Sequence, residues 1–310
     1  MSAWVTMPSE VQAGRASSLT EHHIRLDHDD TSIRILQAGL GNEDGEAVVF
    51  LHGAGARADR WTHSLLACAD RGRWAIAMDF PGHGYSTKGA SPKMSVPGFA
   101  DYVRRTCEGF GIYRVDLVGT SIGGHVAAAI AVAEPQFVAS LTLVGPIGIT
   151  PESDVVRTGL ARAITDTSRV GTAAKLCRVV YDDRLVTTQW IDEEFAINNS
   201  EGAEDSFAAL AEYFLTSYND DVVGSGLRMK APELPCLLVW GADDELVPAT
   251  HVDHVLRLLP DGARWHVISN AGHAPYLEHP EVFNRLLLDF LANPSATSPP
   301  SGPLPISKGT

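Results

Sequence analysis

The feature that most constrains the fold is a series of short apolar runs that alternate with segments of helical periodicity. Several runs are apolar at consecutive positions instead of every second one, which is typical of strands buried on both faces of a parallel sheet. The pattern predicts strands at 32–37, 46–51, 73–79, 114–119, 139–145, 235–240 and 263–268. It predicts helices at about 58–70, 97–110, 121–133, 249–259 and 279–292. This order indicates an α/β fold with a mostly parallel sheet and helices on both faces.

The alternation stops between residues 147 and 232, where helical periodicity continues without a strand-like run. Because this stretch lies between two expected core strands, we expect a helical cap inserted into a core formed by residues 21–146 and 233–292. Residues 1–20 are small and polar, and residues 293–310 are rich in Pro, Ser and Gly. Such compositions favour a flexible N-terminal tail and a disordered C-terminal tail.

Charge and composition exclude several functional classes. The 310-residue chain carries a formal net charge of −14, so it should repel nucleic acids and anionic membranes. It has neither a signal-like start nor an apolar run of about 18 residues, and we expect a cytoplasmic protein with a small-molecule substrate. A homo-oligomer is left open. The four cysteines lack the spacing of a metal or redox pair, and their apolar surroundings indicate reduced, buried thiols.

A Gly-x-Ser-x-Gly pattern occurs where an apolar strand meets an alanine-rich helix. The residues are Gly119-Thr120-Ser121-Ile122-Gly123. A serine in this tight turn projects away from the sheet, and the glycines two residues before and after it let strand and helix approach closely. The helix N-terminus behind it favours developing negative charge. The pattern alone is weak, but this context favours Ser121 as a catalytic nucleophile over a solvent-facing turn serine.

A base and an orienting acid are expected from two later loops. His273 follows the last strand in Asn270-Ala271-Gly272-His273, and the preceding glycine lets the loop bend over the carboxyl edge of the sheet. Asp243 and Asp244 compete for the acid position after strand 235–240, and the resemblance of the frame G-x-x-D-x-x-V-P to a known family pattern favours Asp244. The order Ser, Asp, His predicts that His273 takes the Ser121 proton while Asp244 fixes the imidazole tautomer.

The loop FLHGAGA at residues 50–56 is expected to complete an oxyanion hole. Acyl transfer needs two N–H donors directed at the oxyanion, and we expect them from Ala54 and Ile122. Three histidines compete with His273 for the base. His52 is expected to hold its loop by hydrogen bonds, His83 to hold a glycine-rich turn, and His125 to pack within a helix.

Taken together, the motifs HGAGA, DFPGHGYS, GTSIGG, WGADDELVP and NAGHAPYLEHPE resemble the α/β-hydrolase superfamily over about residues 30–292. Within it, the chain looks most like the meta-cleavage product hydrolases, which break carbon–carbon bonds in ring-fission products. The segments VVYDDRLVT at 179–187 and LVGPIG at 143–148 carry part of that likeness. The resemblance implies an α/β-hydrolase fold, a Ser-His-Asp triad and a cap that shapes the pocket.

Three positions depart from the pattern of that family. A cap arginine that contacts the substrate dienoate is replaced by Glu194, which should repel a carboxylate. Thr120 stands where the family favours asparagine, and Ala274 where it favours tryptophan. The resemblance therefore supports the fold and the triad more strongly than it supports a dienoate substrate.

We therefore expect a hydrolase for an ester, lactone or thioester of a small, apolar, uncharged molecule. Carbon–carbon bond hydrolysis is the alternative, and a ligand receptor or a cofactor-free oxygenase or cyclase represents another class. A serine at position 121 argues against haloalkane dehalogenases and epoxide hydrolases, which use aspartate there. No metal or organic cofactor is expected, since neither a Rossmann glycine pattern nor a P-loop occurs. The candidate pocket residues from the cap are Trp190, Glu194, Phe195, Phe207 and Phe214.

Overall fold

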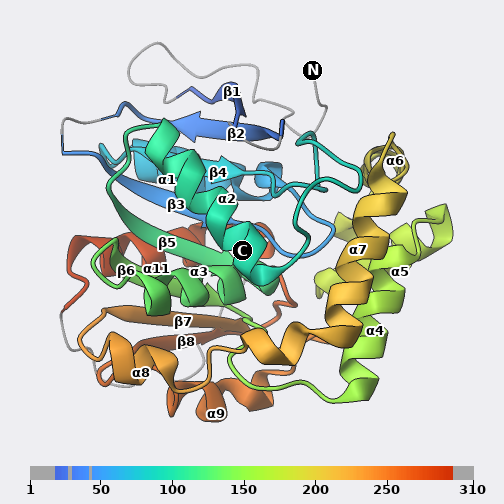
Figure 1. Ribbon diagram of the computed structural model, residues 1–310. Helices are drawn as coiled ribbons and strands as arrows, with labels where there is room; N and C mark the ends of the chain where they lie inside the picture. Colours follow the sequence, from blue (N-terminus) through green and yellow to red (C-terminus); the bar gives the residue numbers. More distant parts are fainter. Residues whose placement is uncertain (1–17, 27–29, 42–43, 296–310) are drawn as a thin grey trace.

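The computed structural model describes residues 18–26, 30–41 and 44–295. Within these residues an eight-stranded sheet forms the centre of the molecule, in the order β1-β2-β4-β3-β5-β6-β7-β8 (Figure 1). The pairs β1–β2 and β2–β4 are antiparallel, and all other neighbours are parallel. The strands are β1 (Thr20–Arg25), β2 (Ser32–Ala38), β3 (Glu46–Leu51), β4 (Ala75–Met78), β5 (Arg114–Thr120), β6 (Val138–Val144), β7 (Cys236–Gly241) and β8 (Arg264–Ile268). The predicted α/β fold is confirmed.

Helices cover both faces of this sheet. One core cluster contains apolar side chains of α2 (Val96–Gly109), α3 (Ile122–Ala133), α8 (Gly226–Lys230) and α9 (Val252–Leu256). The other contains side chains of η1 (Ala58–Trp61), α1 (Thr62–Ala69), α10 (Pro275–Glu278) and α11 (Pro280–Ala292). Strand residues alternate between the two, with Val49 in the first and Val48 in the second. Because both faces are buried, the strands need the continuous apolar runs seen in the sequence.

The strand β1 was not predicted from the sequence. Apart from Ile24 its residues are polar, and all are exposed or half-buried, so no apolar alternation marks the strand. Pairing with β2 along the whole strand makes it extended, which is a tertiary effect at an exposed sheet edge. The predicted strand at 73–79 is shorter, covering only Ala75–Met78. Residues 1–17 and 296–310 of the two expected tails lie outside the described residues.

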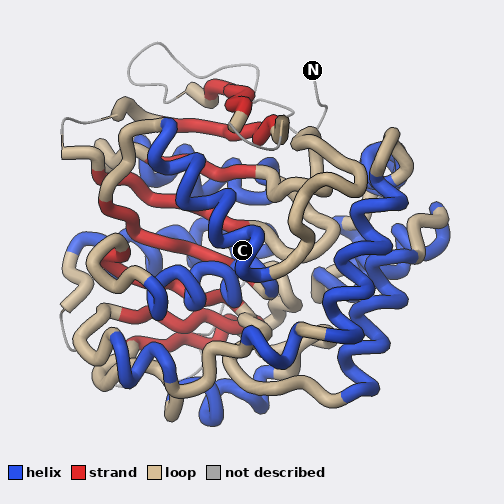
Figure 2. The backbone as a smooth tube through the Cα atoms, viewed as in Figure 1, coloured by secondary structure: helices blue, strands red, loops and turns tan. Residues whose placement is uncertain are grey.

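The segment expected to form the cap is helical and lies at one side of the sheet (Figures 1 and 2). Its elements are α4 (Asp154–Thr165), α5 (Arg169–Val179), η2 (Asp183–Leu185), α6 (Thr188–Asn198), α7 (Ala203–Thr216) and η3 (Tyr218–Asp221). Ser153, Ser168 and Thr187 accept hydrogen bonds from backbone N–H groups in the first turns of α4, α5 and α6. These N-cap side chains accept hydrogen bonds from backbone N–H groups that have no acceptor within the helix. The short α8, which follows, packs on the sheet face through buried Leu227.

Two further sequence predictions concern the burial of the cysteines and membrane-spanning helices. Cys68, Cys107 and Cys236 are buried free thiols as expected, whereas Cys177 is half-buried. Burial raises the pKa of the Cys68 and Cys107 thiols to about 12, so these groups stay protonated. In the part of the chain that the structure describes, no helix is long and apolar enough to cross a membrane.

Gly241 at the end of β7 offers a test of how tightly the loops beyond the sheet are packed. A Cβ there would overlap the carbonyl oxygens of Ala271 and Gly272. We predict that Gly241→Ala lowers the free energy of unfolding by about 1–3 kcal/mol, the usual cost of overpacking. Urea denaturation measures this change.

Gly159→Ala is the matched control, because a Cβ at this position in α4 would have no neighbour within 4 Å. Alanine in a helix interior should raise stability by about 0.5–1 kcal/mol relative to glycine. Equal effects of the two substitutions would contradict the packing argument.

Candidate active site

Ser121 lies in the turn between β5 and α3, in a backbone conformation that is rare for serine. Its φ is 54° and its ψ is −123°. A Cβ at Gly119 would overlap the backbone of Gly123, and a Cβ at Gly123 would overlap the carbonyl oxygens of Leu51 and His52. The two glycines therefore let β5, α3 and the end of β3 meet, and the surrounding packing holds Ser121 in its strained conformation.

The structure brings His273 and Asp244 into direct contact. His273 Nδ1 lies 2.7 Å from Asp244 Oδ2, and both residues are buried. Asp244 Oδ1 accepts hydrogen bonds from the backbone N–H groups of Leu246, at 2.9 Å, and Val247, at 2.8 Å. The neighbouring Asp243 is exposed. Of the two competing aspartates, Asp244 is the one that contacts the histidine.

The loop that carries His273 is tied to the end of α5 by Glu278. One carboxylate oxygen of Glu278 accepts from the N–H of Gly272 and the other from the N–H of Tyr181, both at 2.6 Å. The N–H of Ala274 also donates to the carbonyl of Val179 at 3.1 Å. Burial raises the pKa of the Glu278 carboxyl. Glu278 stands in the segment NAGHAPYLEHPE, but no sequence pattern marks it as a support for the histidine loop.

The expected oxyanion-hole residues come from the loop after β3 and from the start of α3. Ala54 lines the cavity that Ser121 also lines, and Ile122 is the first residue of α3. The first N–H groups of a helix have no acceptor within the helix. His52 holds the loop as expected, because its Nδ1 lies 2.7 Å from the Gly53 carbonyl and its Nε2 accepts from the N–H of Phe80 at 2.9 Å.

Two other histidines have the structural positions expected of them. His83 Nδ1 lies 3.1 Å from the Pro81 carbonyl, and its burial lowers its pKa to about 4. His125 Nε2 lies 2.7 Å from the Asp221 carbonyl, and its burial also lowers its pKa to about 4. Both imidazoles are therefore neutral near pH 7, and neither lines the cavity at Ser121.

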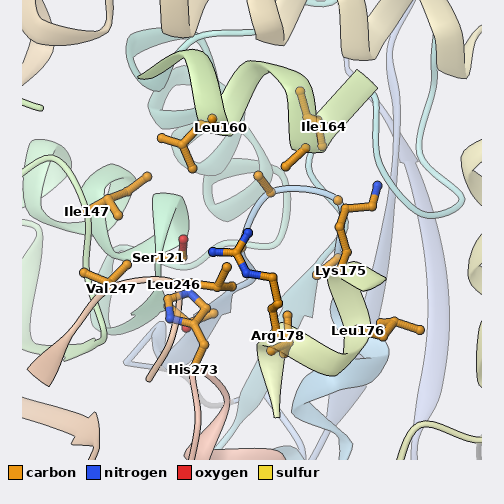
Figure 3. A pocket seen from close by; sticks show the side chains of 18 of the residues that line it. Ser121, Ile147, Leu160, Ile164, Lys175, Leu176, Arg178, Leu246, Val247 and His273 are labelled. Atoms are coloured by element: carbon orange, nitrogen blue, oxygen red, sulfur yellow. The ribbon is translucent and has the colours of Figure 1, made fainter. Parts of the chain in front are cut away.

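A cavity of about 350 Å³ opens on Ser121 and His273. This volume is at the lower end of the range for ligand pockets. The cap helix α4 contributes apolar side chains, including Leu160 and Ile164, and Ile147 and Val247 come from the loops that follow β6 and β7 (Figure 3). The cavity can therefore hold a small, mostly apolar molecule against the serine.

Two of the five expected pocket residues, Glu194 and Phe214, line this cavity. The other three are placed elsewhere, which corrects the sequence expectation. Trp190 is buried under the guanidinium of Arg60, 4.1 Å from its ring centroid. Phe195 is an exposed residue of α6, and Phe207 packs in the core with its ring 5.7 Å from that of His83. Aromatic side chains in a cap are recognised in the sequence, but the direction each one faces depends on helix packing.

Glu194 is a buried member of an ion-pair cluster and not an isolated anion. Its Oε1 lies 2.5 Å from Arg57 Nη1 and 2.6 Å from Arg60 Nη2. Both arginines come from the core, with Arg57 just before η1 and Arg60 within it, and Glu194 comes from α6 in the cap. The expectation that this residue repels a carboxylate is therefore corrected, since two guanidinium groups balance its charge. The pairs also attach the cap to the core.

Besides Arg60, two cations that line the cavity were not predicted from the sequence. Lys175 and Arg178 come from α5, and the guanidinium of Arg178 extends between Ser121 and Lys175 in Figure 3. Their spacing of three residues places them on one helix face. That spacing is common on exposed helices, so nothing in the sequence alone distinguishes these side chains from surface charges.

The buried pairs at Glu194 predict a large effect of removing one charge. Glu194→Gln removes the buried carboxylate that Arg57 and Arg60 share. Although Arg57 keeps its pairs with Asp59 and Glu193, we expect the free energy of unfolding to fall by roughly 3 kcal/mol. Urea denaturation measures it. The control Glu201→Gln, at an exposed position beyond α6, should change stability by less than about 0.5 kcal/mol. A loss of similar size in both variants would argue against the cluster as a cap attachment.

Comparison with known proteins places this geometry in a family. The chain is 31% identical over 266 residues to the dihydrolipoyllysine-residue acetyltransferase component of the acetoin cleaving system of Cupriavidus necator, covering 84% of this chain and 67% of that protein. It is 31% identical over 288 residues to the 2-hydroxy-6-oxononadienedioate/2-hydroxy-6-oxononatrienedioate hydrolase of Burkholderia vietnamiensis, covering 88% and 96% of the two chains.

Solved structures share the fold. The meta-cleavage product hydrolase of Pseudomonas fluorescens superposes with a TM-score of 0.74 at 21% identity, covering 87% of this chain and 97% of that one. The sequence profile of the alpha/beta hydrolase fold family matches residues 46–280. The chain therefore belongs to the α/β-hydrolase fold family, with a likeness to the meta-cleavage product hydrolases within it.

Proposed function

We propose that this protein is a serine hydrolase in which Ser121, His273 and Asp244 form a catalytic triad. The observation that carries the proposal is the 2.7 Å contact between His273 Nδ1 and Asp244 Oδ2, beside a strained serine that lines the same cavity as the histidine. Holding Nδ1 as the proton donor leaves Nε2 of His273 as the acceptor that a general base requires.

The roles follow from this arrangement. His273 removes the proton of Ser121 as the hydroxyl oxygen attacks a substrate carbonyl, and then protonates the leaving group. Asp244 stabilises the imidazolium that forms between these steps. The N–H groups of Ala54 and Ile122 stabilise the oxyanion of the tetrahedral intermediate, and each such donor lowers the barrier by roughly 3 kcal/mol. Water then releases the acyl group by the same sequence of proton transfers.

The lining of the cavity favours a small acyl compound. Apolar side chains from α4 and the core loops surround Ser121, so an ester, lactone or thioester with an apolar acyl or leaving group fits the site. Hydrolysis of a carbon–carbon bond is the second candidate. It is supported by relatives named 2-hydroxymuconate semialdehyde hydrolase, 28% identical over 255 residues in Pseudomonas putida, and by the Burkholderia hydrolase. The same triad serves both reactions, which differ in the leaving group.

The proposal predicts that Ser121→Ala loses hydrolytic activity. With p-nitrophenyl butyrate as substrate, we expect kcat to fall by more than about 10⁴-fold, since the nucleophile itself is removed. A fluorophosphonate probe should label the wild type at Ser121, as mapped by mass spectrometry, and should not label the variant. Equal rates in the two proteins would instead favour a ligand receptor on this scaffold.

The paired aspartates offer a second prediction with an internal control. Asp244→Asn keeps the shape of the side chain but removes the acceptor that orients His273, and kcat should fall by roughly 10³- to 10⁴-fold. Asp243→Asn changes an exposed neighbour and should leave kcat within about twofold. If both variants lost activity equally, the assignment of Asp244 would be wrong. Circular dichroism checks that both variants are folded.

A further inference from the structure

The ammonium group of Lys175 is buried, and this residue lines the cavity. Among the residues that the structure describes, no hydrogen-bond acceptor contacts its Nζ. Burial lowers the pKa of this lysine, whereas the charges of Asp166 and Glu194 raise it. A buried charge without a counter-charge destabilises a folded protein, so its position in the lining of the cavity that also contains the proposed nucleophile calls for a functional explanation.

The two carboxylates whose charges raise the pKa of Lys175 form hydrogen bonds or ion pairs with other residues. Glu194 contacts Arg57 and Arg60. Asp166 Oδ1 accepts from the Oγ of Ser168 at 2.6 Å and from its backbone N–H at 3.2 Å. Neither carboxylate makes a hydrogen bond to the Lys175 ammonium, which therefore keeps its capacity to bind an anion.

Arg178 adds a second cation on the same face of α5. This exposed residue lines the cavity, and its Nη2 donates to the carbonyl of Glu245 at 3.4 Å. Its guanidinium extends into the space between Ser121 and Lys175 (Figure 3). A planar guanidinium suits a planar carboxylate, and a nearby ammonium adds charge.

The acidic residue Glu152 also lines the cavity, but near the other end of α4. It precedes the first residue of that helix by two positions, whereas Ile164, next to last in the helix, lies on the side of Lys175 (Figure 3). Twelve residues of α-helix span about 18 Å. The cavity is therefore cationic toward α5 and acidic toward the start of α4.

We propose that Lys175, assisted by Arg178, binds a carboxylate on the acyl part of the substrate while Ser121 attacks a carbonyl of the same molecule. The substrate class is then an acyl compound with a second, anionic end, and not the uncharged molecule expected from the sequence. This inference rests on the proposed hydrolase function. It assigns specificity to α5, because the glutamate on α6 is balanced by core arginines.

The test compares two substrates that differ only in the charge at the far end. Mono-p-nitrophenyl glutarate has a free carboxylate, and methyl p-nitrophenyl glutarate has the same acyl chain with that carboxylate masked. We expect the wild type to prefer the acid by at least about tenfold in kcat/KM, as for a charge-assisted hydrogen bond. Lys175→Met should reduce this preference at least tenfold, mainly through KM, and Lys175→Arg should retain most of it.

Lys230→Met is the matched control. It removes the same charge from an exposed position on α8, away from the cavity lining, and should leave the preference unchanged. Lys175→Met should also raise the Tm, because it removes an unpaired buried charge. An unchanged preference in Lys175→Met, or a wild type that prefers the methyl ester, would overturn the inference.

Binding to a protein that cannot turn over separates this inference from the proposed function. By titration calorimetry, Ser121→Ala should bind the acid more tightly than the methyl ester, and Ser121→Ala with Lys175→Met should not. Selective binding without turnover in the wild type would contradict the hydrolase proposal alone. Turnover of both substrates without selective binding would contradict the role of Lys175 alone.

Discussion

The arrangement of the site depends on the hydrogen bonds of the Asp244 carboxylate. This carboxylate accepts two backbone N–H groups of its own loop and contacts His273 with its other oxygen. The aspartate thereby fixes the turn after β7 and the imidazole after β8 with one side chain. The two loops belong to adjacent parallel strands, whose carboxyl ends lie at the same sheet edge. The fold brings the loops together, and the hydrogen bonds of Asp244 define the orientation of the histidine.

The cap is attached to this core by two groups of different chemistry. The buried pairs of Glu194 with Arg57 and Arg60 join α6 to η1. At the end of α5, the carboxylate of Glu278 joins Tyr181 to Gly272, next to the histidine. The cap residues that line the cavity are thus held from two sides. A cap fixed in this way keeps the cations of α5 at a defined position relative to Ser121, which specific recognition of a charged substrate requires.

Motifs predicted the parts of the site that depend on local backbone geometry. Ser121, with Gly119 and Gly123, was identified because strand, tight turn and helix are consecutive in the chain. The preference for Asp244 over Asp243 came from a family pattern, and in the structure Asp244 contacts His273 while Asp243 is exposed. The edge strand β1 escaped prediction because pairing with β2, and not its own apolar pattern, makes it a strand.

Continuous apolar runs and glycine turns encode the parallel sheet, the helical insertion and the loops that carry the serine, aspartate and histidine, so these features could be predicted without coordinates. The chemistry of the pocket, in contrast, depends on how the cap packs against the core. The charge of Glu194 is read directly from the sequence, but its balance by Arg57 and Arg60 arises from a contact between residues more than 130 positions apart. Lys175 likewise looks like any surface lysine until helix packing buries its ammonium at the cavity, since burial and pairing are properties of the assembled fold.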